Sequence, residues 1–544
     1  RENMKTTLST LRNLLTAPAN RPWLLLLALL VLITLALAPL FPHRVTPASA
    51  SLERFSGERA MAHLPIIARE AHPSGSPAQA VVRDYLVEQL SSLGLETEIQ
   101  HTWGVDNVVA RLDGRDPSGA ILLQAHYDSY NGPGAADNGA GVAALLEIAR
   151  ALSASPQMGN DVIFLFDDSE ELPDAFTGTR AFIAEHPWMA EVRVAIGMDT
   201  AVRGFIATVD TGSDNGWLVN VLARAYTGGA WTSLSGGGGY DTKPFRERGI
   251  RVLELEDNYP FHQQHTPDDV PAIVNPGSVQ QLGEQALSVV REMGDLDLSV
   301  TSGEQQTYAY VPLLGLAHYP QSWALPFAIL AAVLMLVAVG LALWQRAASW
   351  RGLGLAALVT LLCAALAGLL TNAVWGAAPD LFDWPTRAWR DWPEVIPPHG
   401  WLILVLTNLI HLALMVAVYR MVRRWSGRVD FSLVGLLLFG LFAPALAFAA
   451  PQGAILVTWP ALIGALCWIA AVVLNRQGKA WALDLGALGA ALLVIVYILP
   501  LVPAVFMGDG TKSVAITAAV WVLILAVLLP VVDGVVVRGR QRKA

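Results

Sequence analysis

The C-terminal part of the chain is a succession of long apolar segments, and these limit the fold more than any other feature. From about Trp323 to the end, charged residues fall mainly in short stretches between the apolar segments. About 20 consecutive apolar residues let a helix cross a bilayer, and only helices and closed barrels satisfy their backbone hydrogen bonds in lipid. We therefore expect seven spanning helices, at about 323–344, 353–375, 401–419, 431–450, 454–474, 481–504 and 514–537.

A further apolar run lies near the N-terminus, at Pro22–Leu40, after Lys5, Arg12 and Arg21. It could be a retained anchor or a secretory signal, because Ala48-Ser49-Ala50 resembles a cleavage site. The run is longer than a usual signal core, which favours the anchor. The chain then divides into three predicted parts: the N-terminus and first span (1–44), a soluble domain (45–310) and a seven-span membrane domain (311–544).

The connections between the spans predict the orientation of the chain. Basic residues fall in every second connection, at 346–351, 420–428 and 476–479, and again after 537. Cytoplasmic loops of membrane proteins carry the excess of lysine and arginine. We expect an integral membrane protein with both termini in the cytoplasm and residues 45–322 outside it.

Polar residues inside the spans, such as His411 and Asn372, raise the alternative of a transport path. A simpler interpretation is favoured, in which His411 bonds to a neighbouring helix. Asp484 and Asp533 lie near predicted cytoplasmic ends beside Lys479 and Arg538, where a surface ion pair costs little.

Composition excludes some functions. The formal net charge of −9 and the isoelectric point near 5.7 give no sign of the basic patch that nucleic acid requires. The two cysteines, Cys363 and Cys467, both lie in predicted spans, so the soluble domain needs no disulfide. The sequence does not indicate an oligomeric state.

The soluble part alternates strand-like and helix-like stretches, which predicts an α/β sandwich. Helical spacing of apolar residues occurs at Ala78–Leu93 and Ala140–Leu152. The expected strands are Glu96–Thr102, Asn107–Leu112, Ala120–Ala125, Asp161–Phe166, Val192–Met198 and Arg251–Leu255.

Histidines and carboxylates follow the ends of these expected strands. His126 and Asp128 follow the strand Ala120–Ala125, and Asp137 precedes the next helix. Further candidates come after three other strands: Asp167 to Glu171, Asp199, and the stretch from His262 to Asp269. Ligands of open α/β sheets bind at the carboxyl ends of the strands, and histidine with carboxylate suits zinc.

The adjacent pair Glu170-Glu171 supports a metal site. Two neighbouring carboxylates repel each other unless a cation lies between them. In a metal site, one carboxylate can bind the ion while the other handles protons.

These motifs resemble the co-catalytic zinc aminopeptidases of clan MH. The resemblance rests on HYD at 126–128, DNGAG at 137–141, Glu170-Glu171, the strand-ending Asp199 and HTPDD at 265–269. Further similarity lies in HPSGSPAQAVVRDYL (72–86) and TRAFIAEHPW (179–188). With a membrane region after it, the domain most resembles the endoplasmic reticulum metallopeptidase group and its bacterial relatives.

The resemblance implies a fold, a metal centre and a reaction. The fold would be a zinc-aminopeptidase-like α/β/α sandwich with a mixed central sheet, followed by an all-α polytopic membrane domain. Two Zn²⁺ would be held, one by His126, Asp137 and Asp199, the other by Asp137, Glu171 and His265, with Asp137 bridging. Asp128 would orient His126, and Glu170 would be the general base for a metal-activated water. The expected protein is a membrane-anchored aminopeptidase acting on peptides, in a bacterial inner membrane.

Several positions are open to other interpretations. His262 is a rival to His265, which is favoured because the family's histidine directly precedes Thr-Pro. Asp268 and Asp269 are better explained as capping residues than as ligands. Tyr240 could donate to an oxyanion, but packing is the simpler role. The segment after Glu171, Leu172 to Phe176, departs from the family's glycine-rich turn and leaves the side-chain preference of the enzyme open.

Two other functions compete with the peptidase. A glutaminyl cyclase-like acyltransferase would share the HYDS stretch and the glutamate pair but use a single zinc, whereas Asp137 to Gly141 keep the peptidase form. A non-catalytic receptor or scaffold would have lost ligands, whereas this chain carries all five and the base.

Overall fold

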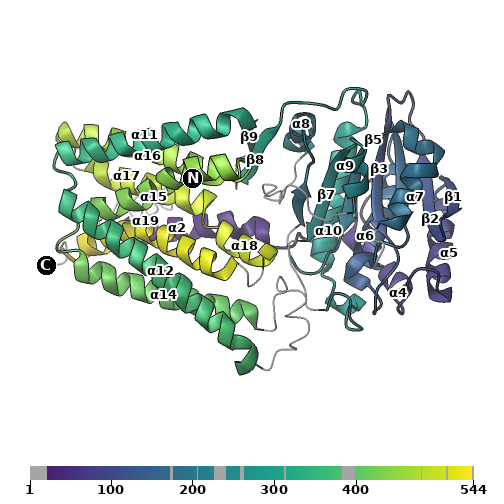
Figure 1. The fold of residues 1–544 in the computed structure, drawn as a ribbon, viewed down its shortest axis with the longest axis horizontal. Helices are drawn as coiled ribbons and strands as arrows, with labels where there is room; N and C mark the ends of the chain where they lie inside the picture. The colour runs from purple at the N-terminus through teal and green to yellow at the C-terminus, as the bar shows by residue number, and fades with distance from the viewer. Residues whose placement is uncertain are drawn as a thin grey trace, which may run out of the picture. The chain divides into compact units, whose positions relative to one another are not determined.

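The computed structural model describes residues 21–171, 176–204, 206–225, 241–257, 263–311, 314–382, 399–479, 481–509 and 513–541. The chain forms two compact units. One contains Pro39–Tyr310 and Leu314–Gln321, and the other contains the N-terminal helix and the chain from Ser322 onward. Figure 1 shows the strands in the first unit and a bundle of long helices in the second.

The soluble unit is built on a mixed seven-stranded sheet with the strand order β1-β2-β4-β3-β5-β7-β6. Four central strands, β4, β3, β5 and β7, run parallel, and β1, β2 and β6 are antiparallel to their neighbours. The bounds are β1 Glu96–Thr102, β2 Val105–Leu112, β3 Ala120–His126, β4 Asp161–Asp167, β5 Val192–Asp199, β6 Ile206–Asp210 and β7 Arg251–Asp257. The predicted α/β class and mixed sheet are confirmed.

Helices cover both faces of the sheet, because the central strands are apolar on both sides. Every residue of β3 and β4 is buried, which is typical of parallel strands between two helical layers. One face packs against α5 (Pro77–Ser92), α6 (Ala140–Ser153), α8 (Gly216–Ala225) and α10 (Pro276–Met293). The other face packs against α7 (Thr177–Glu185) and α9 (Lys243–Glu247), through Phe182 and Phe245.

The sequence did not predict the edge strand β6, helix α10 or a second, two-stranded sheet. This sheet is formed by β8 (Gln306–Val311) and β9 (Gly315–Pro320). The strand β6 is only five residues long and pairs with β7 alone, so its apolar residues form no period long enough to stand out.

Among the residues that the structure describes, the membrane unit has seven helical segments long and apolar enough to cross a bilayer, as predicted. Its helices are α11 (Ala324–Trp344), α12 (Trp350–Leu381), α14 (Gly400–Val422), α15 (Arg428–Ala449), α16 (Ile455–Arg476), α17 (Trp481–Tyr497), α18 (Leu501–Asp509) and α19 (Val514–Gln541). The predicted span at 481–504 is divided into α17 and α18 beside Pro500, because proline cannot donate the backbone hydrogen bond that a continuous helix needs.

The N-terminal apolar run forms α2 (Arg21–Leu37), which has 17 residues and contacts α17 and α19. It is shorter than the seven segments counted as candidate spans. Its retention or cleavage stays a prediction.

His411 contacts a neighbouring helix as the sequence favours, whereas Asp533 and Asp484 lie beside Arg423 and Arg428, which are other basic residues than the expected Arg538 and Lys479. His411 lies 3.2 Å from the Thr371 hydroxyl of α12. Asp533 pairs with Arg423 at 2.5 Å, and Asp484 lies 3.6 Å from Arg428. These contacts join helices, so a structural role accounts for His411, Asp484 and Asp533.

A buried carboxylate ties the N-terminal segment of the soluble unit to its core. Glu147 of α6 accepts hydrogen bonds from the Ser56 backbone and from the side chains of Arg59 and Arg150, all at 2.6–2.9 Å. Both arginines also donate to backbone carbonyls of residues 48–54. The Glu147 side chain is only 1% exposed, so its loss leaves two guanidinium groups without their anion.

We predict that Glu147→Ala lowers the thermal unfolding midpoint of the soluble unit by several degrees. Removing one partner of a buried ion pair costs about 3–5 kcal/mol. Glu191→Ala is the control, because Glu191 also pairs with an arginine but is 43% exposed, and exposed pairs contribute about 0–1 kcal/mol. Scanning fluorimetry of the full chain in detergent compares the two. Equal shifts in the two variants contradict the structural role of Glu147.

Candidate metal centre

The parallel strands bring polar residues to one edge of the sheet. In the register of the strands, His126 at the end of β3 lies opposite Asp167 at the end of β4. Asp199 at the end of β5 lies opposite Glu256 of β7. The expected convergence of the strand-end residues at the carboxyl edge is therefore present.

One group of potential donors consists of His126, Asp137 and Asp199, which offer ligand atoms within 4.8 Å of one another. The His126 Nε2 atom lies 3.2 Å from Asp137 Oδ1 and 3.8 Å from Asp199 Oδ1. His126 and Asp137 are buried, and Asp199 is partly exposed. Three donors this close can contact one ion at the usual zinc distances of about 2.0–2.2 Å.

A second group consists of Asp137, Glu171 and His265, again within 4.8 Å. The His265 Nε2 atom lies 3.2 Å from Asp137 Oδ2 and 2.7 Å from Glu171 Oε2. The two groups share Asp137, whose Oδ1 faces His126 and whose Oδ2 faces His265. The structure thus brings all five predicted ligand residues together, in the two triplets that the resemblance implies.

The loop that carries Asp137 is held from both sides. Asn138 donates to the Met198 carbonyl of β5 at 2.9 Å and accepts from the Gly141 backbone at 3.0 Å. A side chain at Gly141 would place its Cβ 2.1 Å from the Asn138 amide oxygen, so the close approach requires glycine. In the DNGAG stretch, Asp137 is thus a candidate ligand, and Asn138 and Gly141 hold the backbone that carries it.

Asp269 holds the other side of this loop. Its carboxylate accepts hydrogen bonds from the backbone of Ala136 at 2.8 Å and of Asp137 at 3.2 Å, which is a capping contact. The sequence missed Gln264, which donates to Asp137 Oδ2 at 2.7 Å; it is recognisable only by its place beside His265.

Asp128 connects the first histidine to the glutamate pair. Its two carboxylate oxygens accept hydrogen bonds from the backbone of Glu170 at 3.1 Å and of Glu171 at 3.3 Å. The His126 Nδ1 atom lies 3.5 Å from Asp128 Oδ1 and 3.2 Å from its backbone carbonyl. Asp128 therefore contacts His126 as expected, and it also fixes the backbone of both glutamates, which the sequence did not predict.

The charges in the centre strongly perturb one another. Burial raises the pKa of Glu170 to about 9, with Glu171, Asp199 and Asp137 adding to the effect of burial and His126 opposing it. Burial and the charge of Asp137 likewise raise the pKa values of Glu171 and Asp199 to about 7. Burial lowers the pKa of His265, but the hydrogen bonds with Asp137 and Glu171 outweigh it and bring the value to about 10.

This crowding of buried carboxylates fits a site for cations. Carboxylates held close together are costly to ionise unless positive charge is added, and a bound metal ion supplies the largest local charge. Imidazole and carboxylate are also the ligand types that zinc takes. The donor set therefore fits a divalent cation such as zinc.

The structure adds one acidic residue, Asp241, to which the sequence assigned no role. Asp241 is 4% exposed, and its Oδ2 atom has no hydrogen-bond partner among the described residues. Burial and the charges of Glu170 and Asp199 raise its pKa well above the usual value. Tyr240, His262 and residues 172–175 lie outside the described residues.

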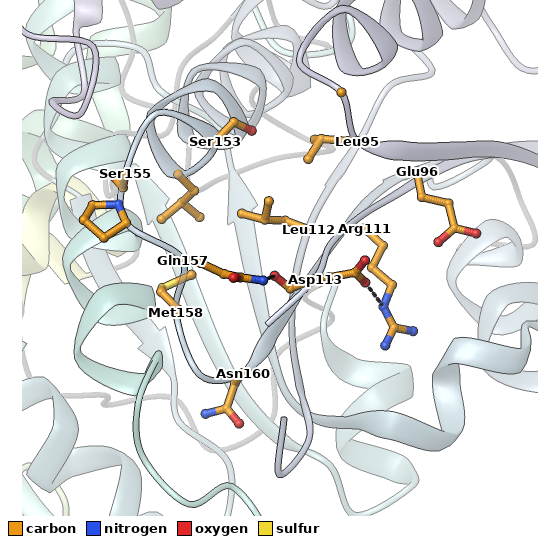
Figure 2. A pocket seen from close by; sticks show the side chains of 13 residues that line it. Leu95, Glu96, Arg111, Leu112, Asp113, Ser153, Ser155, Gln157, Met158 and Asn160 are labelled. Carbon is orange, nitrogen blue, oxygen red and sulfur yellow. Dashed lines mark hydrogen bonds and ion pairs between the residues drawn. The ribbon is translucent and has the colours of Figure 1, made fainter. Parts of the chain in front are cut away.

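A separate cavity of about 580 Å³ lies at the opposite edge of the sheet, where β2 ends and β4 begins (Figure 2). Arg111 and Asp113 border it and form an ion pair at 3.1 Å. Arg111 also pairs with Asp161 and Glu191, so its charge is already neutralised. The cavity shares no lining residue with the two donor groups.

Residues 107–290 match the model of peptidase family M28. Endoplasmic reticulum metallopeptidase 1 from Mus musculus is 27% identical over 341 residues, which cover 54% of this chain and 37% of the relative. The vacuolar membrane protease of Candida albicans (strain WO-1) is 28% identical over 332 residues, covering 57% and 39%. The chain thus spans well under half the length of these relatives.

Two solved structures share a likeness with the chain. An aminopeptidase from Aneurinibacillus sp. strain AM-1 is 13% identical, covers 47% of this chain and 98% of its own, and has a TM-score of 0.40. An Acidobacteriales bacterium glutaminyl cyclase is 24% identical, with 46% and 99% covered and a TM-score of 0.38. At these scores the likeness does not distinguish one activity from the other.

The family match spans every one of the five donor residues, Asp128 and Glu170, and it lies wholly within the soluble unit. Residues 107–290 are therefore a domain of peptidase family M28.

Proposed function

We propose that the protein is a membrane-anchored di-zinc aminopeptidase that removes N-terminal residues from peptides. The observation that carries the proposal is the shared Asp137, whose two carboxylate oxygens each face a different imidazole at 3.2 Å. A single-zinc enzyme has no need of two complete donor triplets that meet at one carboxylate.

The residues have separate roles in this proposal. His126, Asp137 and Asp199 hold one zinc, and Asp137, Glu171 and His265 hold the other. Zinc supplies Lewis acidity toward the scissile carbonyl and lowers the pKa of a coordinated water to about 7. The proton transfers themselves fall to the chain's own side chains.

Glu170 is the proposed general base. Its carboxylate lies within 4.8 Å of donor atoms of His126 and Glu171, yet neither triplet needs it as a ligand. It takes a proton from the attacking water as the carbon–oxygen bond forms, and gives it to the leaving amine as the carbon–nitrogen bond breaks.

Asp128 is the proposed positioning residue. It orients His126 through the ring Nδ1 side, and it holds the backbone of Glu170 and Glu171 through one carboxylate oxygen each. Asp128 therefore positions Glu170, the proposed base, and Glu171, a proposed ligand of the second zinc. It also orients His126, a proposed ligand of the first.

The proposed orientation places the soluble unit outside the cytoplasm and both termini inside, following the basic connections between the spans. The seven apolar helices make the protein an integral membrane protein. The bacterial inner membrane stays a prediction from the sequence.

We predict that Glu170→Gln retains two zinc ions per chain and lowers turnover of peptides with a free N-terminus about 10²–10⁴-fold, as expected for loss of a general base. Metal content and cleavage are measured on the same preparations, with N-acetylated peptides in parallel. Glu191→Gln, an equal change of charge at an exposed carboxylate, keeps the wild-type rate.

Other outcomes of that experiment support other functions. One zinc with cyclisation of N-terminal glutamine supports the acyltransferase. Neither metal nor turnover in the wild type supports a receptor or scaffold. Unchanged turnover in Glu170→Gln removes Glu170 from the mechanism.

We predict that His265→Ala leaves one zinc per chain, whereas Asp137→Asn weakens binding of both ions. His265 belongs to one triplet, and Asp137 belongs to both. Elemental analysis after dialysis against dilute chelator gives the stoichiometry. Two zinc ions retained by His265→Ala would rule out this assignment.

We predict that Asp128→Asn lowers zinc affinity about 10–100-fold, the usual cost of removing a group that orients a ligand. An asparagine oxygen can accept only one of the two backbone hydrogen bonds, so turnover at saturating zinc also falls. Chelator competition measures affinity, and Asp268→Asn, which alters an exposed carboxylate, is the control. A variant with wild-type affinity and turnover contradicts the role of Asp128.

A further inference from the structure

Several helix ends of the membrane unit meet at one end of the bundle. The Ser349 backbone at the start of α12 donates to Asp430 of α15 at 3.1 Å. The Ser426 hydroxyl donates to the Gly352 carbonyl at 2.9 Å. Arg476 of α16 lies over the Trp344 ring of α11. The α11–α12, α14–α15 and α16–α17 connections are therefore neighbours, and α19 also ends here (Figure 1).

The acidic groups at this end are already engaged. The Asp430 carboxylate accepts hydrogen bonds from the backbone of Ser349 and Gly427. Asp533 pairs with Arg423 at 2.5 Å, and Asp484 lies 3.6 Å from Arg428. Asp533 and Asp484 thus face guanidinium groups of the bundle, and Asp430 caps backbone N–H groups.

The remaining cations have no acidic partner among the described residues. They are all exposed, and we call them the basic end: Arg346, Arg351, Arg420, Arg424, Arg476 and Lys479. Like charges gathered on a surface repel one another unless an anion lies among them. The basic end therefore presents positive charge that the described part of the chain does not balance.

Two of these arginines are held in place by exposed tryptophans. The Arg424 guanidinium lies 3.7 Å from the centre of the Trp425 ring, and that of Arg476 lies 4.6 Å from the Trp344 ring. The two tryptophans are 56% and 65% exposed. Stacking uses the face of the guanidinium and leaves its N–H groups free, and this planar fork matches phosphate in a bidentate contact.

The position of the tryptophans indicates the environment of these arginines. Trp344 ends α11 and Trp425 follows α14, at the ends of apolar helices long enough to cross a bilayer. Tryptophan at such ends lies at the level of the lipid headgroups. The stacked guanidinium groups are thus at the depth where the phosphates of lipids occur.

We propose that the basic end binds the headgroups of acidic phospholipids, with Arg424 and Arg476 as the principal phosphate contacts. The proposal rests on the membrane spans and not on the peptidase activity, so either can fail without the other. Arg423 and Arg428 contribute little, because Asp533 and Asp484 already neutralise them.

The test uses the full chain, purified in detergent and mixed with equal amounts of phosphatidylglycerol and phosphatidylcholine. Native mass spectrometry counts the lipids that remain bound. The wild type retains phosphatidylglycerol in preference. Since each arginine near an acidic surface contributes about fivefold in affinity, Arg424→Gln/Arg476→Gln weakens phosphatidylglycerol binding about thirtyfold and leaves phosphatidylcholine unchanged.

The matched control is Arg69→Gln/Arg248→Gln, which removes the same charge from exposed positions of the soluble unit and retains the wild-type preference. An equal loss in this control shows a non-specific effect of net charge and overturns the proposal. Equal retention of the two lipids by the wild type also overturns it. Displacement of phosphatidylglycerol by millimolar inorganic phosphate assigns the site to free anions and rejects a lipid site.

A second variant keeps the proposal testable if the glutamine variant does not fold. Arg424→Lys/Arg476→Lys preserves the charge and loses the planar fork, so it binds phosphatidylglycerol several-fold more weakly than the wild type. Wild-type binding by this variant, with unchanged elution in size-exclusion chromatography, contradicts the role of the stacked guanidinium groups.

Discussion

The soluble unit depends on a concentration of buried negative charge that the polypeptide does not neutralise by itself. Asp137, Glu170, Glu171, Asp199 and Asp241 lie close enough to perturb one another's pKa, and the described part of the chain places two imidazoles, His126 and His265, among them. Such an arrangement costs folding free energy unless cations enter it. The four parallel strands end at one edge of the sheet and bring these residues together there. Hydrogen bonds to the backbone hold the loops that carry them in place. The fold of the domain thus places its carboxylates where a bound cation would balance their charge.

Much of this was readable from the sequence. Residues that must be apolar on both sides of a sheet leave long unbroken runs, so β3, β4 and β5 were predicted nearly to the residue. Histidines and carboxylates after such runs indicated a metal site, and the resemblance to the clan MH aminopeptidases implied which five of them are the candidate donors. The seven spans were predicted because length and hydropathy alone define them, although the break beside Pro500 divided one of them into two helices.

What the sequence could not supply depends on contacts between distant segments. The backbone contacts of Asp128 with Glu170 and Glu171 join positions more than 40 residues apart. Asp241 is one aspartate in a polar loop until α9 and the sheet bury it. Gln264 becomes a partner of Asp137 only when the segment that carries His265 folds over the loop. The spacing of apolar residues reports only on neighbouring positions in the sequence. Contacts between distant segments do not change that spacing, so they cannot be predicted from it.

The segment that leads from α2 into the sheet has a consequence for where the soluble unit begins. The Thr46 backbone donates to Gln280, and the Thr46 carbonyl accepts from Ser56, while the Ala48 carbonyl accepts from Arg59. Even His43 lies 3.1 Å from Glu284 of α10. Residues 43–50 are therefore part of the soluble fold, and its edge lies ahead of the boundary expected at residue 45. Truncation of the chain after Ala50 would remove residues 43–50, which contact α10 and Arg59, the partner of Glu147. A version of this unit released from its membrane helices must begin before His43 to remain whole.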